Sequence, residues 1–262
     1  MTARLPALFV SHGSPMIAIE TEGWGRHLRE FAATIPKPEA VVVVSGHFEA
    51  PTPVRITASL APETLHDFSG FPPEISRIQY VARGDPELAA RIRNLLGRSG
   101  ISATLDARRG LDHGAWVPLR YLFPRADVPV IEVSQPFPRT PRDALRIGTA
   151  LSSLRGDGVL LMGSGGIVHN LRRIDPADDP ARVATWARAF DEWMALRLAD
   201  MDVPSILNYR EAAPSAESAV PSNDHFDPLF VILGSAAPGE RVHTLHEGFR
   251  YGSLSMRSFT LS

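Results

Sequence analysis

Four short runs of aliphatic, mostly β-branched residues constrain the fold of this chain more than any other feature. Runs that are apolar on both faces are typical of buried strands in a parallel sheet, because helices cover both surfaces of such a sheet. Helical patterns lie between the runs, with Asp85 as an expected N-cap. The alternation predicts an α/β fold with a central, mostly parallel sheet flanked by helices. The expected strands cover residues 7–10, 40–44, 128–133 and 159–162, and the expected helices cover residues 25–34, 86–99, 141–154 and 181–200.

The size and composition of the chain predict a single domain. A chain of 262 residues can bury a substantial core, and we find no internal repeat, so we expect one catalytic domain spanning residues 1–262. A formal net charge of -2 makes nucleic acid and membrane surfaces unexpected partners. The chain has no cysteine, no secretory leader and no apolar stretch long enough to cross a membrane. We therefore expect a cytoplasmic protein, and an oligomer is compatible with the sequence.

Five of the nine histidines end a strand-like run or stand in a comparable setting, and these are His12, His47, His113, His169 and His225. Open α/β sheets bind their ligands beyond the carboxyl ends of the strands, so these side chains are expected to meet in one crevice. Neutral imidazole is a common ligand of Zn(II) and Fe(II). We therefore predict a site for one divalent metal ion at the carboxyl ends of the strands. Its expected ligands are His12, His47 and His225, with His169 as a further ligand or a base.

Two of these histidines are also candidates for proton transfer. His113 and His169 have glycine neighbours that leave room for a substrate, and an imidazole near its ordinary pKa can take a proton and return it later. We predict that both are catalytic and that His113 also contacts the substrate. Residues 51–73, rich in Pro, Thr and Ser, predict a long ordered loop over the crevice. This loop adds His66 as a substrate contact, and Asp224 beside His225 is another.

The residue types alone leave the metal and the reaction open. Three histidines and a water molecule suit Zn(II), so a zinc-dependent hydrolase is the main alternative to a redox enzyme, and a non-catalytic binding protein is a third. The turn Gly163-Ser164-Gly165-Gly166 does not have the Gly-x-Ser-x-Gly register of an esterase nucleophile, because Met162 occupies the first glycine position. Ser164 is therefore not predicted to be a nucleophile.

Six ordered motifs resemble the class III extradiol ring-cleavage dioxygenases, and within them the DOPA extradiol dioxygenase-like subgroup. The resemblance covers nearly the whole chain and implies a single α/β domain that opens a catechol-type ring beside its hydroxyls with dioxygen. It implies that the residues matching His12, His47 and His225 bind one metal ion. This ion is Fe(II) for ring cleavage, and Zn(II) is another possible occupant. The motifs are Ser11-His12-Gly13-Ser14-Pro15-Met16, Ser45-Gly46-His47-Phe48, and residues 66–72, 110–119, 163–171 and 224–229.

The same resemblance assigns the remaining histidines. It places His169 close to or on the ion, places His113 in the wall of the catechol pocket, and makes one of these two the base. The chain departs from the subgroup before its last motif, where it reads Val220-Pro221-Ser222-Asn223. Changed polar contacts around a small ligand alter which of its groups are held, so DOPA is not carried over as the substrate.

Overall fold

A six-stranded sheet forms the centre of the computed structural model, which describes residues 4–20 and 23–262. Its strand order is β6-β2-β8-β1-β12-β9, in which β6, β2, β8 and β1 are parallel and β12 and β9 are antiparallel additions at one edge. This arrangement confirms the predicted α/β class and the mostly parallel sheet. The strands are β1 (Ala7–Ser11), β2 (Ala40–Ser45), β6 (Val130–Glu132), β8 (Val159–Gly165), β9 (Val242–His246) and β12 (Ser258–Leu261).

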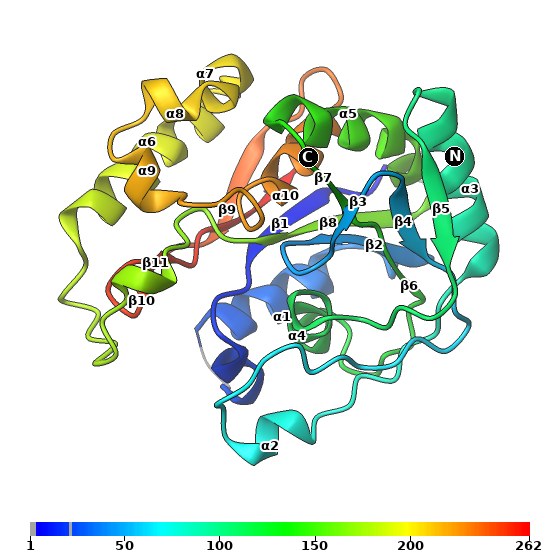
Figure 1. Cartoon of the computed structure of the whole chain (residues 1–262), viewed down its shortest axis with the longest axis horizontal. Helices are drawn as coiled ribbons and strands as arrows, with labels where there is room; N and C mark the ends of the chain where they lie inside the picture. The colour runs from blue at the N-terminus through cyan, green and yellow to red at the C-terminus, as the bar shows by residue number, and fades with distance from the viewer. Residues whose placement is uncertain (1–3, 21–22) are drawn as a thin grey trace.

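Helices cover both faces of the sheet, as Figure 1 shows. In β2, Val42 and Val44 belong to a core shared with α3, α5, α6 and α10, whereas Val41 and Val43 belong to a core shared with α1 and α4. Both faces of the strand are therefore buried, which explains its unbroken apolar run. The helices are α1 (Trp24–Thr34), α2 (Pro73–Ser76), α3 (Pro86–Arg98), α4 (His113–Leu122), α5 (Pro141–Leu151), α6 (Thr185–Ala199), α7 (Val203–Leu207), α8 (Tyr209–Ala212), α9 (Ala216–Ala219) and α10 (Pro228–Gly234).

The four expected helices are present as α1, α3, α5 and α6, with ends that differ by a few residues. Asp85 is the N-cap of α3, and its side chain accepts hydrogen bonds from the backbone of Glu87 at 3.0 Å and of Leu88 at 2.9 Å. The helix expected to reach residue 154 ends at Leu151 and continues as a 3-10 turn over Ser152–Asp157. None of the described helices is long and apolar enough to cross a membrane.

The expected loop over residues 51–73 is partly wrong. It contains strand β4 (Val54–Thr57), which pairs in parallel with β5 (Ala103–Asp106). Val54 and Ile56 point into the core, and this alternation is short enough to be hidden by the prolines and threonines around it. Two further strand pairs are small: β3 (Glu49–Pro51) with β7 (Gln135–Phe137), and β10 (Phe249–Arg250) with β11 (Leu254–Ser255).

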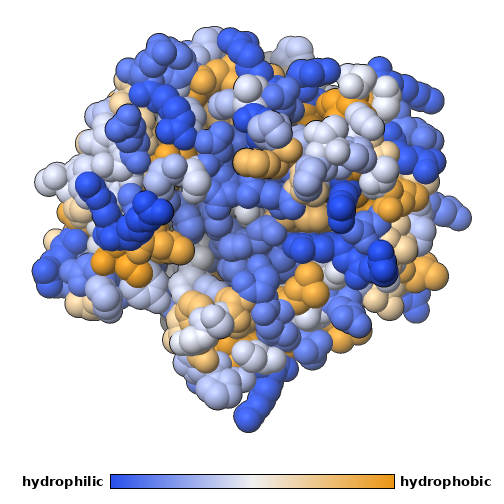
Figure 2. All heavy atoms as spheres, in the orientation of Figure 1, coloured by the Kyte–Doolittle hydropathy of each residue, from blue (hydrophilic) through white to orange (hydrophobic). Residues whose placement is uncertain are grey.

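The fold leaves a hollow on the surface. Figure 2 shows a notch between the part of the molecule that carries β10 and β11 and the part that carries α2, with apolar side chains on both sides of the notch. The carboxyl ends of β1, β2 and β8 are neighbours because these strands are adjacent in the sheet. Side chains that follow these strands therefore meet at one edge.

Candidate metal centre

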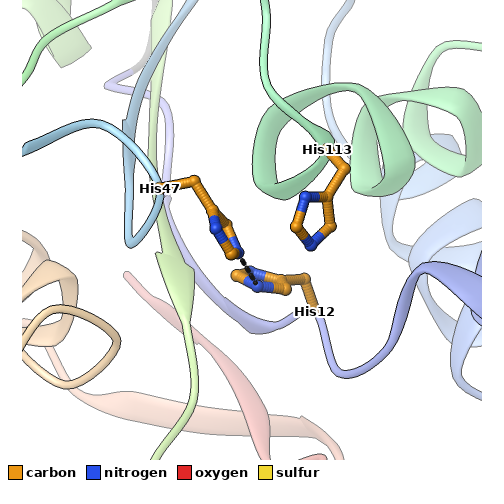
Figure 3. Close-up of side chains that lie close together, drawn as sticks. All are labelled: His12, His47 and His113. Carbon is orange, nitrogen blue, oxygen red and sulfur yellow. Dashed lines mark hydrogen bonds between the residues drawn. The ribbon is translucent and has the colours of Figure 1, made fainter. Parts of the chain in front are cut away.

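Five histidines from separate segments converge at the carboxyl ends of β1, β2 and β8. The Nε2 atom of His47 lies 3.0 Å from Nε2 of His12 and 3.1 Å from Nε2 of His225. A ring nitrogen of His113 also lies within 4.8 Å of ring nitrogens of His12 and His47, and Figure 3 shows these three rings turned toward one another. The ring of His169 stacks on that of His225, with centroids 3.7 Å apart. The structure thus brings together all five histidines that the sequence placed in one crevice.

The local sequence explains how three of these rings reach the site. His12 directly follows β1, and His47 follows β2 after the single residue Gly46. His113 is the first residue of α4, whose N-cap Asp112 accepts hydrogen bonds from the backbone of Ala115 and from the Ser45 hydroxyl. The N-terminus of α4 is therefore fastened to the end of β2, which places the two imidazoles beside each other.

Glycines allow the His225 backbone to approach the strand ends. The carbonyl oxygen of His225 accepts a hydrogen bond from Gly166 N at 2.8 Å. A Cβ atom on Gly165 would lie 1.9 Å from that same oxygen, and a Cβ atom on Gly46 would lie 3.1 Å from the His225 ring. Only glycine fits at position 165, so the end of β8 is a site of close approach for the His225 backbone.

Hydrogen bonds occupy the Nδ1 side of three of the converging rings, those of His12, His113 and His225. The Ser164 hydroxyl donates its proton to Gly114 O at 2.5 Å, so its oxygen accepts from Nδ1 of His12 at 2.9 Å. Nδ1 of His225 donates to Asp224 Oδ2 at 2.6 Å. Nδ1 of His113 and of His47 both face Asp67, as described next. Such partners fix the tautomer of a metal-binding histidine and turn its other nitrogen toward the ion.

Asp67 holds two of the rings at once. Its Oδ1 accepts hydrogen bonds from the backbone N–H of His113 at 2.9 Å and from Nδ1 of the same residue at 3.0 Å. Its Oδ2 lies 3.5 Å from Nδ1 of His47. Burial alone would raise the pKa of Asp67, but the hydrogen bonds from His113 outweigh this effect and lower the pKa to about 2. Asp67 is therefore an ionised carboxylate that accepts two hydrogen bonds from His113 and lies beside Nδ1 of His47.

The arrangement of nitrogens fits a bound cation. With Nδ1 protonated, the Nε2 atoms of His12, His47 and His225 all carry lone pairs, and they face one another at hydrogen-bond distance. Burial, followed by the neighbouring histidines, lowers the pKa of His47 to about 2 and that of His12 well below its usual range. Both rings are therefore neutral at pH 7, and neither carries a second proton that could form a hydrogen bond between the facing Nε2 atoms. Three converging neutral imidazoles are a suitable donor set for one divalent metal ion.

His169 differs from the other four histidines. No side-chain hydrogen bond fixes its tautomer among the described residues, and its ring lies flat on His225 with an interplanar angle of 5°. Burial, and then the nearby His225, lower its pKa to about 3, so the ring is neutral, unlike the imidazole near its ordinary pKa that the sequence predicted. The backbone N–H of His169 donates to Ala219 O, which anchors the residue after β8.

Four of the five histidines, His47, His113, His169 and His225, form the floor of a cavity of about 480 Å³. Asp67, Phe68 and Phe71 line it on one side, with Leu171, Ile174, Tyr251 and Leu254 among the other wall residues. Two predicted substrate contacts are not part of this wall. His66 has its Nε2 2.9 Å from Ile78 O, and Asp224 lines a separate depression with Glu49 and Arg139.

The sequence did not reveal what Asp67, Ser164 and Asp224 do for the histidines. Asp224 was expected to meet the substrate, but its side chain contacts the ring of His225 and lies outside the cavity wall. Asp67 belongs to the motif at residues 66–72. Only its position in a loop between two histidine-bearing segments could have indicated its role. The partner of His12 is far away in sequence, so no local signal identified Ser164.

Comparisons with known proteins give a consistent result. The family described as the catalytic LigB subunit of aromatic ring-opening dioxygenase matches residues 6–259. A protein of Beta vulgaris named 4,5-DOPA dioxygenase extradiol is 37% identical over 96% of this chain and 94% of its own length. A protein of the same name from Escherichia coli is 36% identical over 98% of this chain and 94% of its own length.

A solved structure shares the fold. It is described as an uncharacterized protein from Escherichia coli, has a TM-score of 0.84 and is 32% identical in sequence. The match covers 99% of this chain and 100% of that one. The likeness therefore extends over the whole fold.

Proposed function

This chain belongs to the LigB family of aromatic ring-opening dioxygenases, and from that premise we propose that it opens catechol-type rings at a metal ion held by His12, His47 and His225. The chain is an extradiol dioxygenase with a buried histidine site for one metal ion. The observation that carries the proposal is the convergence of three unprotonated Nε2 atoms, two of them from residues that line an apolar cavity. The proposed catalytic domain is the whole chain, residues 1–262.

We propose Fe(II) as the catalytic metal. When bound, Fe(II) supplies the one-electron chemistry that allows dioxygen to react with an aromatic ring. Zn(II) has no redox chemistry, so it fits the same nitrogens but does not support ring opening. The family membership makes the zinc-dependent hydrolase considered from the sequence a weaker candidate. The co-substrates are then a small aromatic diol and dioxygen.

His169 is the proposed base. Its neutral ring lines the cavity and has no side-chain hydrogen bond that fixes its protonation among the described residues. It can therefore accept a proton from a substrate hydroxyl and return it to the ring-opened product. A fourth-ligand role is the alternative, and the metal content of a His169 variant distinguishes the two.

His113 is the proposed substrate-orienting residue. Asp67 holds its Nδ1, so its Nε2 presents a lone pair to the cavity beside His12 and His47. A lone pair at this point accepts a hydrogen bond from a substrate hydroxyl and fixes the angle of the ring. His113 also lies close enough to His12 and His47 to contribute to the metal group, which the same metal analysis tests.

The relatives named 4,5-DOPA dioxygenase extradiol support a catechol as the substrate class. The test is to load the protein with Fe(II) under anaerobic conditions and to measure oxygen uptake with a panel of catechols. We expect one dioxygen consumed per catechol and a yellow ring-opened product, and we expect no uptake by the Zn(II)-loaded protein. Absence of uptake with every catechol of the panel would refute the proposal.

A further inference from the structure

The outer part of the cavity has an apolar wall. Phe68, Phe71 and Leu254 line it, together with Leu171 and Ile174. Leu171 is 60% exposed and Ile174 is 38% exposed, whereas His113 and His225 at the other end are almost fully buried. The two exposed residues therefore mark the mouth of the cavity. A ring whose hydroxyls face the histidines would direct its substituent toward these side chains.

The charges around the cavity are unfavourable for an anionic substituent. Among the described residues that line it, none is a lysine or an arginine, and the one carboxylate is Asp67. The nearby Arg250 is paired with Glu20 and Asp178. Ser14, Ser69 and Tyr251 offer neutral hydroxyls, which can donate single hydrogen bonds but cannot neutralise a carboxylate. A carboxylate moved from water into such a wall loses hydration without gaining an ionic partner.

The volume leaves room for a sizeable substituent. A cavity of about 150 Å³ is large enough for benzene. The cavity described above is about 480 Å³, so a bare catechol ring would fill only a minor part of it. Apolar side chains around the remaining space favour an occupant that is itself apolar, because both surfaces then leave water.

We propose that the preferred substrate is a catechol with a neutral, apolar substituent, such as an alkyl or aryl group, and that the cavity discriminates against catechols whose substituent carries a carboxylate. This inference rests on the proposed function, because it assigns the substrate class of the same site. The discriminating wall is formed by Leu171, Ile174 and Leu254 with Phe68 and Phe71.

The test compares substituents of the same shape and different charge. The acid is 3-(3,4-dihydroxyphenyl)propionate, and its neutral counterparts are its methyl ester and 4-(3-methylbutyl)catechol, whose branched end has the shape of the carboxylate. We expect kcat/KM of the Fe(II)-loaded protein to be about 100-fold higher for the neutral compounds than for the acid. Equal values, or a preference for the acid, would overturn the inference.

Binding measurements separate this inference from the proposed function. Calorimetry of the metal-loaded protein in the absence of oxygen measures affinity without turnover, and it should show the same preference for the neutral compounds. If the neutral catechols bind more tightly than the acid but none of the compounds is consumed, the proposed function fails while the binding preference stands. If catechol is consumed and the acid binds as tightly as its neutral counterparts, the preference fails while the function stands.

An added cation at the mouth provides an independent check. Leu171→Arg should raise kcat/KM for the acid by about 10-fold relative to its ester, because a guanidinium at the mouth can pair with the carboxylate. Leu196→Arg is the matched control, since Leu196 on α6 is also 60% exposed but does not line the cavity, and it should leave the ratio unchanged. An unchanged acid-to-ester ratio in Leu171→Arg would count against a substituent directed toward this wall.

Discussion

A single oxygen of Asp67 accepts two hydrogen bonds from His113, one from its backbone N–H at 2.9 Å and one from its Nδ1 at 3.0 Å. The second oxygen of Asp67 lies 3.5 Å from Nδ1 of His47. One carboxylate from the loop between β4 and α2 therefore anchors the first residue of α4, fixes the tautomer of His113 and faces the Nδ1 side of His47. Asp67 is a positioning residue that acts through the histidines at the floor of the cavity.

Asp67→Asn should lower kcat/KM and metal affinity by roughly 10-fold to 100-fold, the range found when a partner of a metal-binding histidine is removed. The amide has one oxygen and one NH₂ group. In one orientation the NH₂ group faces the Nδ1–H of His47, and in the other it faces both donors of His113, so one histidine loses its acceptor in either case. Oxygen uptake and a competitive metal titration measure the two effects.

Asp85→Asn is the matched control for this substitution. Asp85 is also a carboxylate that accepts two backbone hydrogen bonds, but it caps α3 far from the histidines, and asparagine caps a helix equally well. We expect it to leave metal affinity and turnover unchanged. If Asp67→Asn behaved in the same way, the carboxylate would not be needed to orient the rings.

Metal binding should stabilise the folded protein. The converging Nε2 atoms of His12, His47 and His225 exist as a group only in the native state, so an ion bound there favours folding. At a free metal concentration of 100 times Kd, the gain is about 2.7 kcal/mol, or roughly 5–10 °C in Tm. Calorimetry before and after treatment with a chelator measures the shift. A Tm that does not respond to added Zn(II) or Fe(II) would contradict the site.

Part of this site could be predicted from the sequence because the signals are local. His12 and His47 end apolar runs, and parallel strands bring their carboxyl ends to one edge of the sheet. The predicted parallel strands and the metal-binding chemistry of imidazole were therefore enough to predict that both rings lie in one site. The partners that fix the rings could not be predicted in the same way. Ser164 contacts His12 from a position 152 residues away, and only the register of β1 against β8 makes them neighbours.

The antiparallel edge of the sheet also escaped prediction. Ser258–Leu261 alternates polar and apolar residues over only four positions, and β9 is mostly half-exposed, so neither segment resembles the continuous runs of the parallel strands. The short helix α10, which follows His225, was likewise not predicted from its apolar run of seven residues. Such a run is compatible with either a buried strand or a buried helix until tertiary contacts decide.

His12 and His47 should contribute little pH dependence to metal affinity in the mildly acidic range. Burial and the neighbouring histidines lower the pKa of His47 to about 2 and that of His12 well below 6.5, so both are already unprotonated in the metal-free native protein at pH 5.5. Two ligands with an ordinary pKa near 6.5 would each be mostly protonated at that pH, which would weaken binding by about 100-fold. Titrations at pH 7.5, 6.5 and 5.5 should therefore not show this loss of about 100-fold from His12 and His47.

The number of protons released when the metal binds can contradict this prediction. Calorimetric titrations in two buffers of different ionisation enthalpy count the protons released when the metal binds. We expect almost none from His12 and His47 at pH 6. Release of about two protons per metal would mean that these rings are protonated before binding and that their low pKa values do not describe the metal-free protein.

Substitution of His169 distinguishes a base from a ligand. His169→Ala should retain one metal ion per chain but lose about 100-fold to 10,000-fold in turnover, which is the usual contribution of a general base. His225→Ala should lose the metal itself, because Nε2 of His225 belongs to the converging group. Metal analysis of the purified variants gives the answer directly. Loss of the metal from His169→Ala would identify the residue as a fourth ligand instead.

Two glycine-to-alanine substitutions should have opposite effects on stability. A Cβ atom at Gly165 would lie 1.9 Å from the carbonyl oxygen of His225, so Gly165→Ala must displace that backbone, at a cost of roughly 1–3 kcal/mol and with weaker metal binding. Gly97 lies in α3 with nothing within 4 Å of an added Cβ, so Gly97→Ala should stabilise the helix by about 0.5–1 kcal/mol and leave metal affinity unchanged. Urea denaturation at a fixed metal concentration measures both free energies of unfolding. Because the close approach at Gly165 is what holds His225 over the strand ends, a fully stable, metal-binding Gly165→Ala variant would contradict this packing.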